Sequence, residues 1–170
     1  VNSWGEYRKA VLDLILSSGA SVALYYGYKT QAGDIQCWLP FTSKTIEVAP
    51  WLFITISTIM IWASINTTNC TDGVDGLSST LVLIGLITVG AIFYFILGPT
   101  DIAEYLLVPH LKDGASWAVI IFTLSGVLMG YLWHNAYPSK VLMGDAGSRA
   151  LGFFIGVCVM LSGNPFLIFA

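Results

Sequence analysis

The stretch Leu77–Leu97, LSSTLVLIGLITVGAIFYFIL, runs for 21 residues without a charged side chain. A helix rises about 1.5 Å per residue, so a segment of this length spans about 30 Å. That length matches the hydrocarbon core of a bilayer. The stretch therefore predicts a membrane-spanning helix, and the rest of the chain has to be compatible with a membrane location.

The composition agrees with that location. Of the 170 residues, 56% are hydrophobic and only 10% are charged, with a mean hydropathy of +0.77. Soluble domains carry about 25% charged residues, so the deficit predicts a surface that faces lipid. A net charge of −3 excludes a general basic surface for nucleic acid. Cys37, Cys70 and Cys158 are too widely spaced to indicate a disulfide framework or a metal site.

Four further segments are apolar enough to cross a bilayer. They lie at 10–28, 50–65, 115–133 and 150–162. The sequence thus predicts a single transmembrane domain over residues 1–170, an all-α integral membrane protein with about five helices in this chain. The first segment fits least well, because it contains Asp13 and three serines.

The alternation of the five segments assigns each connection to a side of the membrane. The connections at 66–76 and 134–149 fall on one side, together with the N-terminus, and those at 29–49 and 98–114 on the other. Four Lys and Arg residues lie on the first side and three on the second. The excess favours a cytoplasmic position for the loops at 66–76 and 134–149.

Two patterns predict local packing. The segment at 29–49 contains two short β-prone runs, at 35–39 and 45–48, which predict a small extracytoplasmic β-hairpin. The glycine pairs Gly126/Gly130 and Gly152/Gly156 have the spacing that lets neighbouring helices approach closely. We expect these contacts within the fold, with a dimer seam as the alternative.

The first candidate functional motif is NTTNCTDGVDGL at 66–77. Asn66, Asn69, Asp72 and Asp75 recur at every third position, directly before an apolar helix. An aspartate near the hydrocarbon is costly, about 2.5–3.5 kcal/mol at a helix centre. The presence of two aspartates here therefore indicates a functional role. Aspartates three residues apart face one cavity if the turn is helical. The alternative reading is a solvated turn, because Asp-Gly pairs are common in turns.

The second motif is HNAYPSKVLMGDAGSR at 134–149. Its Gly-Asp-Ala-Gly-Ser sequence places Asp145 between two glycines, immediately before a helix. Such a loop offers backbone N–H groups and a helix N-terminus to an anion, and a carboxylate adds a hard oxygen ligand. The alternative reading makes Ser148 the N-cap of the last helix, with Asp145 in a turn.

The charges of the two loops narrow the chemistry. Three aspartates, Asp72, Asp75 and Asp145, stand against Lys140 and Arg149. Acidic groups alone repel phosphates, whereas Mg²⁺ is bound by one or two carboxylates together with phosphate oxygens. Metal-assisted phosphoryl chemistry at one membrane face is therefore a hypothesis that the residues support by themselves.

The two motifs together resemble the polyprenyl-phosphate N-acetylhexosamine-1-phosphate transferases. The resemblance rests on N-x-x-N-x-x-D-G-x-D-G-L at 66–77 and on N-A-x-P…M-G-D-x-G-S-x-x-L-G at 135–152. Within this family, the sequence is most similar to the muramoyl-pentapeptide branch, largely through residues 134–138. The chain corresponds to about half of a full transferase, its central part.

The resemblance implies a ten-helix protein of the bacterial inner membrane that acts at the cytoplasmic face. The implied reaction joins UDP-N-acetylmuramoyl-pentapeptide to undecaprenyl phosphate with Mg²⁺, giving lipid I and UMP. A homodimer is common among such proteins. Asp145 corresponds to a magnesium ligand, and the implied catalytic residues are Asp145, Asp72 and Asp75. The implied substrate-binding residues are Asn66, Asn69, Cys70, Gly73, Asn135, Leu142, Gly144, Ser148 and Lys9.

The sequence also departs from the family pattern. An early Asp-Asp pair and a late His-rich loop are not among the 170 residues, so we expect this chain alone to be inactive. The family commonly has a phenylalanine that stacks on uracil where this sequence has Leu142. Either that contact is lost or another ring supplies it.

Two other functions stay open. A UDP-N-acetylglucosamine-1-phosphate transferase would share both motifs. A transporter with an Asp-lined ion path would also use intramembrane acids, but it predicts polar residues deep within the helices. The acids here gather at one face, which favours interfacial chemistry.

Overall fold

The computed structural model describes residues 5–32, 36–38, 45–47, 49–72, 76–106, 108 and 110–163. Glu6 and residues 31–32, 36–38 and 45–47 are described by their backbone only. Within these ranges, five helices are long and apolar enough to cross a membrane. The predicted class, an all-α multi-pass membrane protein, is confirmed.

The elements follow one another in a simple order. They are α1 (Glu6–Ala32), β1 (Gln36–Trp38), β2 (Thr45–Glu47), α2 (Pro50–Thr71), α3 (Leu77–Ala91), its π-helical continuation η1 (Ile92–Leu97), α4 (Thr100–Tyr105), α5 (Gly114–Asn135) and α6 (Gly144–Leu161). The two short strands pair antiparallel, with Cys37 opposite Ile46. The turn of the predicted hairpin, at 39–44, lies outside the described residues.

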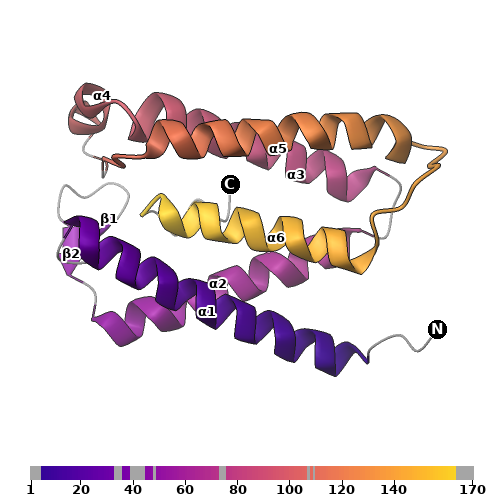
Figure 1. Ribbon diagram of the computed structural model, residues 1–170, viewed down its shortest axis with the longest axis horizontal. Coiled ribbons are helices and arrows are strands. Elements are labelled where there is room, and N and C mark those ends of the chain that lie inside the picture. The colour runs from indigo at the N-terminus through magenta and orange to yellow at the C-terminus, as the bar shows by residue number, and fades with distance from the viewer. Residues whose placement is uncertain are drawn as a thin grey trace.

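The five long helices run side by side, with α6 between two helix pairs (Figure 1). α3 and α5 form one pair, whose buried core includes Leu86, Phe93 and Ile121. α1 and α2 form the other, around Phe53 and Ile61. α6 contributes Leu151 and Cys158 to the first core and Met160 to the second. Many large apolar side chains, such as Ile84, Val119 and Val127, stay exposed, as a lipid-facing surface requires.

Most of the polar residues that weakened the first predicted segment lie on the inner face of α1. Asp13, Ser17 and Ser21 are all buried. The Ser17 and Ser21 hydroxyls donate to the carbonyl oxygens of Asp13 and Ser17, at 2.6 and 2.8 Å. The Thr58 hydroxyl of α2 lies 3.2 Å from that of Ser21. Their hydrogen-bonding groups are therefore satisfied by protein, which lets the helix stay in the apolar region.

Two helices extend into the segments that the sequence predicted to be loops. α2 continues to Thr71 instead of ending at Ile65, and α6 begins at Gly144 instead of near Ala150. The polar residues do not end α2, because their side chains bond within the helix. Asn66 donates to the Trp62 carbonyl at 2.7 Å, and Thr71 to the Thr68 carbonyl at 2.8 Å. The alternative role for Ser148 was wrong: it lies within α6 and is not its N-cap.

The glycine pair Gly152/Gly156 brings α6 into backbone contact with α2. A Cβ atom added at Gly152 would lie 2.7 Å from the Ser64 carbonyl oxygen and 2.8 Å from the Ile65 Cα. At Gly156 it would lie 3.1 Å from the Ile61 Cα. The Ser64 hydroxyl donates to the Gly152 carbonyl at 2.8 Å across the same seam. The expected approach within the fold is confirmed for this pair.

The other glycine pair makes no such contact. Added Cβ atoms at Gly126 and Gly130 of α5 would meet nothing within 4 Å among the residues described here. For these two positions, the expected approach of another helix of the chain does not occur within that part of the structure. They provide a control for the contact at Gly152.

We predict that Gly152→Ala destabilises the protein by about 1–3 kcal/mol, because the added methyl group has to push the α2 backbone away. Gly126→Ala is the matched control. It is expected to be neutral or slightly stabilising, since alanine is the better helix former. Thermal unfolding in detergent measures both. Equal midpoints for the two variants would contradict the close α2–α6 seam.

Candidate active site

Residues of both sequence motifs meet where α2 ends and α6 begins. The Ser148 hydroxyl donates to Asn69 Oδ1 at 3.1 Å, across a sequence separation of 79 residues. Ser148 is fully buried, and its oxygen also lies 3.3 Å from the carbonyl oxygens of Gly144 and Asp145. This contact brings residues of the two motifs together.

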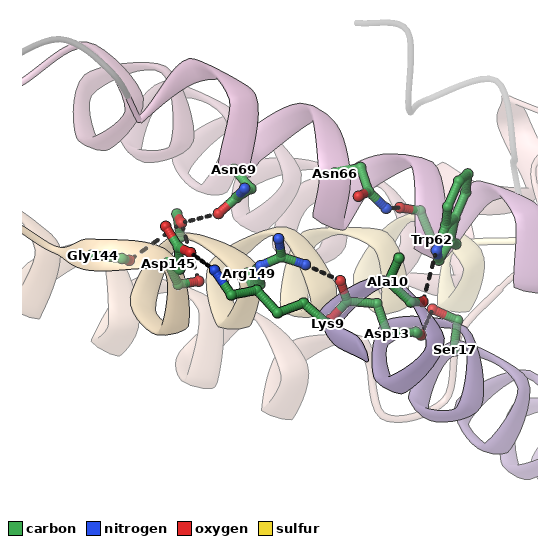
Figure 2. Close-up of polar contacts among 11 residues, drawn as sticks. Lys9, Ala10, Asp13, Ser17, Trp62, Asn66, Asn69, Gly144, Asp145 and Arg149 are labelled. Atoms are coloured by element: carbon green, nitrogen blue, oxygen red, sulfur yellow. Dashed lines mark hydrogen bonds and ion pairs between the residues drawn. The ribbon is translucent and has the colours of Figure 1, made fainter. Parts of the chain in front are cut away.

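Asp145 forms an ion pair with Lys9 of α1, as Figure 2 shows. The Asp145 side chain is 58% exposed and that of Lys9 20% exposed, so the pair faces the open side of the site. Asp145 lies in the first turn of α6, where the helix dipole favours an anion. Lys9 and Asp145, predicted separately as site residues, are therefore in direct contact.

Asp72 lies beside this pair, at the C-terminal end of α2. A helix C-terminus disfavours an anion, so Asp72 does not serve the stability of its own helix. Burial raises the pKa of the Asp72 carboxyl above its ordinary value, and the nearby Asp145 carboxylate raises this pKa further. The Ser148 hydroxyl beside Asp72 opposes the shift. Two carboxylates are thus held close enough to repel each other.

The paired carboxylates fit a divalent cation. In the described part of the chain, no group of three or more His, Cys, Asp or Glu side chains is arranged around one point. Mg²⁺ does not need such a group, because it keeps several waters and binds one or two carboxylates plus substrate phosphates. A cation beside Asp145 would also relieve its repulsion with Asp72. The donor set therefore suits magnesium better than a zinc-type cage.

Asn135 connects the two motifs on the other side of the site. It is buried at the end of α5, and its Oδ1 accepts from the Gly76 N–H at 3.1 Å and from the Ser79 hydroxyl at 3.0 Å. Its Nδ2 donates to the Val141 carbonyl at 2.8 Å. These bonds hold the start of α3 against the loop at 136–143, and the predicted substrate-binding role of Asn135 stays a prediction.

The loop at 136–143 presents Leu142 to the outside. Its side chain is 74% exposed, and the Tyr131 hydroxyl lies 3.4 Å from the carbonyl oxygen of the preceding residue, Val141. Gly144, which follows, has a positive φ of 68°, a conformation that suits glycine. Leu142 and Gly144 thus lie at the edge of the site.

The remaining predicted site residues are less closely connected. The Asn66 amide donates to the Trp62 carbonyl of its own helix, and Cys70 is exposed one residue beyond Asn69. Gly73 and Asp75 lie outside the described residues. Their predicted roles stay predictions.

Sequence reasoning missed one contact. Arg149 of α6 forms an ion pair with Asp13 of α1, one turn along from the pair of Lys9 and Asp145 (Figure 2). A signal was present, because Lys9/Asp13 and Asp145/Arg149 are both spaced four residues apart. Residues with this spacing share one face of a helix.

Comparison with known proteins finds a family and relatives that match most of this chain. The model of the family described as "Glycosyl transferase family 4" matches residues 1–163. A phospho-N-acetylmuramoyl-pentapeptide-transferase of Treponema pallidum (strain Nichols) is 56% identical over 165 residues, which is 97% of this chain and 45% of the relative. One from Campylobacter jejuni (strain RM1221) is 37% identical over 159 residues, 93% of this chain and 41% of the relative.

A third such transferase, from Gemmatimonas aurantiaca, is 39% identical over 135 residues, 76% of this chain and 35% of its own length. The chain therefore spans less than half the length of these curated relatives.

We predict that Asn135→Ala costs about 1–3 kcal/mol of stability, because the buried Gly76 N–H and Ser79 hydroxyl lose their acceptor. Asn66→Ala is the matched control, since its amide bonds to a carbonyl of its own helix. We expect it to change stability by no more than about 0.5 kcal/mol. Chemical or thermal unfolding in detergent compares them. A loss at Asn135 no larger than at Asn66 would show that the connection is weak.

The raised pKa of Asp72 predicts a pH dependence. A carboxyl with a raised pKa takes up its proton at a higher pH than usual, so the anion is lost early as the pH falls. In EDTA-treated protein, Asp145→Asn should move the Asp72 titration to lower pH, because one cause of the shift is removed. The midpoint should still lie above the ordinary aspartate value, because burial remains. Infrared difference spectra against Asp72→Asn isolate its carboxyl band.

Asp101→Asn provides the control for that titration. Asp101 is an exposed aspartate on α4, and its removal should leave the Asp72 midpoint in place. An Asp72 midpoint that does not move in Asp145→Asn would contradict the proximity of the two carboxylates.

Proposed function

The chain belongs to glycosyl transferase family 4, and on that basis we propose that it forms part of a phosphoglycosyl transferase of peptidoglycan synthesis. The proposed enzyme transfers phospho-N-acetylmuramoyl-pentapeptide from its uridine diphosphate donor to undecaprenyl phosphate. The products are lipid I and UMP. The names and the 37–56% identities of the relatives support this choice of branch.

The observation that carries the proposal is the contact between Lys9 and Asp145 beside Asp72. It joins α1, α2 and α6 at one end of the bundle. A cation next to paired carboxylates suits a substrate that is itself anionic and comes with a divalent metal. A site made only of acids would repel a pyrophosphate, and a site made only of lysines would not hold the metal.

The chemistry sets what these groups have to do. An oxygen of the acceptor phosphate forms a bond to the phosphorus that carries the sugar, and the bond from that phosphorus to the oxygen of UMP breaks. Charge is spread over the phosphoryl oxygens during this exchange, so catalysis depends on positioning and charge stabilisation. When bound, Mg²⁺ supplies positive charge to these oxygens and orients the displacement.

The residues of this chain take distinct parts in the proposal. Asp145 holds the metal, and the Lys9 ammonium binds a donor phosphate oxygen. Asp72 and Asn69 line the donor pocket, with Ser148 fixing the Asn69 amide. Cys70, Gly73, Asp75 and Asn66 are proposed to complete that pocket along the same motif. Asn135 keeps the two loops at the correct separation, and Leu142 and Gly144 form the rim.

We also propose that the site faces the cytoplasm at the inner membrane of a bacterium. The relatives come from bacteria, and the side that carries the motifs has the excess of Lys and Arg. Exposed aromatic side chains at helix ends, such as Trp51 and Trp133, suit a membrane interface. The 170 residues alone are expected to be inactive, since they span under half of the relatives.

The test is UMP release by a full-length protein that contains these residues, in detergent, from UDP-N-acetylmuramoyl-pentapeptide and undecaprenyl phosphate. We expect release that needs Mg²⁺ and stops with EDTA. Asp145→Asn should lower kcat by on the order of 10²–10³, the range for removing a group that stabilises transition-state charge. Asp101→Asn, an exposed aspartate on α4, should retain activity.

Each other outcome has a definite meaning. Release only from UDP-N-acetylglucosamine would assign the protein to the sister branch. Release that persists in EDTA would remove magnesium from the proposal. No release from either donor by folded protein would contradict the transferase function and favour a transporter, which the same preparation can test in liposomes.

A further inference from the structure

A second ion pair lies behind the proposed site, between Asp13 of α1 and Arg149 of α6. Their side chains are 8% and 13% exposed, so this pair is much less accessible than the pair of Lys9 and Asp145. Both residues lie on helices long and apolar enough to span a membrane. Neither has a part in the chemistry proposed above.

α1 and α6 depend on these side chains because they share little direct packing. α1 packs mainly on α2, and α2 packs mainly on α6. Where α1 and α6 do meet, apolar side chains of both helices pack around Met160, and polar groups make further contacts at the two ends. At the far end, the Tyr28 hydroxyl lies 3.0 and 2.6 Å from the carbonyl oxygens of Met160 and Leu161. At the site end, the two ion pairs do so (Figure 2).

The order of the charges permits a single register. Along α1 the charges run positive then negative, Lys9 to Asp13, and along α6 negative then positive, Asp145 to Arg149. The two helices run in the same direction, and both spacings are four residues, about one turn. A shift by one turn would place Lys9 opposite Arg149 or Asp13 opposite Asp145. Like charges would then meet, and the Asp13 and Arg149 side chains are too little exposed for solvent to screen them well.

We propose that the Asp13–Arg149 pair is a positioning element that fixes the axial register of α1 against α6 and so holds the Lys9 ammonium at Asp145. The proposal extends the function proposed above, in which Lys9 binds a donor phosphate oxygen. Asp13 and Arg149 act through Lys9 and touch no substrate. Without their pair, α1 can slide or rotate on α2. The backbone position from which the long Lys9 side chain extends is then no longer fixed.

The first test measures the register without using activity. In a full-length protein whose cysteines are replaced by alanine, Lys9→Cys and Asp145→Cys are joined by a short bifunctional thiol reagent. The rate of cross-linking is then compared with Asp13 and Arg149 intact, with both neutralised (Asp13→Asn with Arg149→Gln), and with both exchanged (Asp13→Arg with Arg149→Asp). The double neutral variant avoids leaving one buried charge unpaired.

We expect the neutral variant to cross-link several-fold more slowly and the exchanged variant to cross-link like the parent, because a pair of either polarity holds the register. Thermal unfolding checks that each variant is folded. Equal rates in the neutral variant and the parent would overturn the proposal. If the neutral variant does not fold, the exchanged variant tests the proposal by itself. Slow cross-linking by folded exchanged protein would overturn the proposal equally.

The second test uses the native Lys9 and Asp145. Asp13→Asn with Arg149→Gln should lower kcat for UMP release by about 10- to 100-fold, the cost of misplacing a catalytic group by about 1 Å. The KM for the donor should change less. Slower cross-linking with an unchanged kcat would mean that the Asp13–Arg149 pair does fix the register but that Lys9 is not used in the reaction. That result would contradict the proposed role of Lys9 and not the positioning role of the pair.

Discussion

The backbone contact between α2 and α6 determines how the rest of the molecule is arranged. Because Gly152 and Gly156 have no side chains, α6 lies directly on the Ile61–Ile65 turn of α2. In a membrane, helices gain little from the hydrophobic effect and depend on close packing and polar contacts. This seam places the end of α2, with Asn69 and Asp72, beside the start of α6, with Asp145 and Ser148. The core on either side then forms around α6.

The polar groups inside the bundle follow from the same constraint. Lipid offers no hydrogen bonds, so buried polar atoms have to find partners within the protein. The serines of α1 bond to its own backbone, Ser64 bonds across to Gly152, and Asp13 pairs with Arg149. The charged groups of the proposed site lie at one end of the bundle, where Asp145 is largely exposed. The bundle thus keeps its reactive charges at the membrane surface.

The site has two kinds of residue. Asp72, Asp145 and Lys9 bring charge to one place and are proposed to contact the substrate and its metal. Asn135, Ser148 and the Asp13–Arg149 pair bond to protein, and they hold the first group in place. The pKa of Asp72 is raised by burial and by the nearby Asp145, so the two carboxylates lie close enough to repel each other. Such repulsion is useful if a cation is bound there, and it has no structural benefit.

By itself, the sequence determined the membrane helices and the residue types of the two motifs, and it predicted that both motifs lie on the same side. Runs such as Leu77–Leu97 depend on hydropathy and length alone, and alternation of the spans fixes the faces. The sequence could not show that α2 continues to Thr71 and α6 begins at Gly144, because whether a polar residue ends a helix depends on where its side chain bonds. Nor could it show that Asn135 connects the two loops or that Asp13 meets Arg149. Those contacts join residues 56–136 positions apart, and only the packing of α1, α2, α3, α5 and α6 brings them within bonding distance.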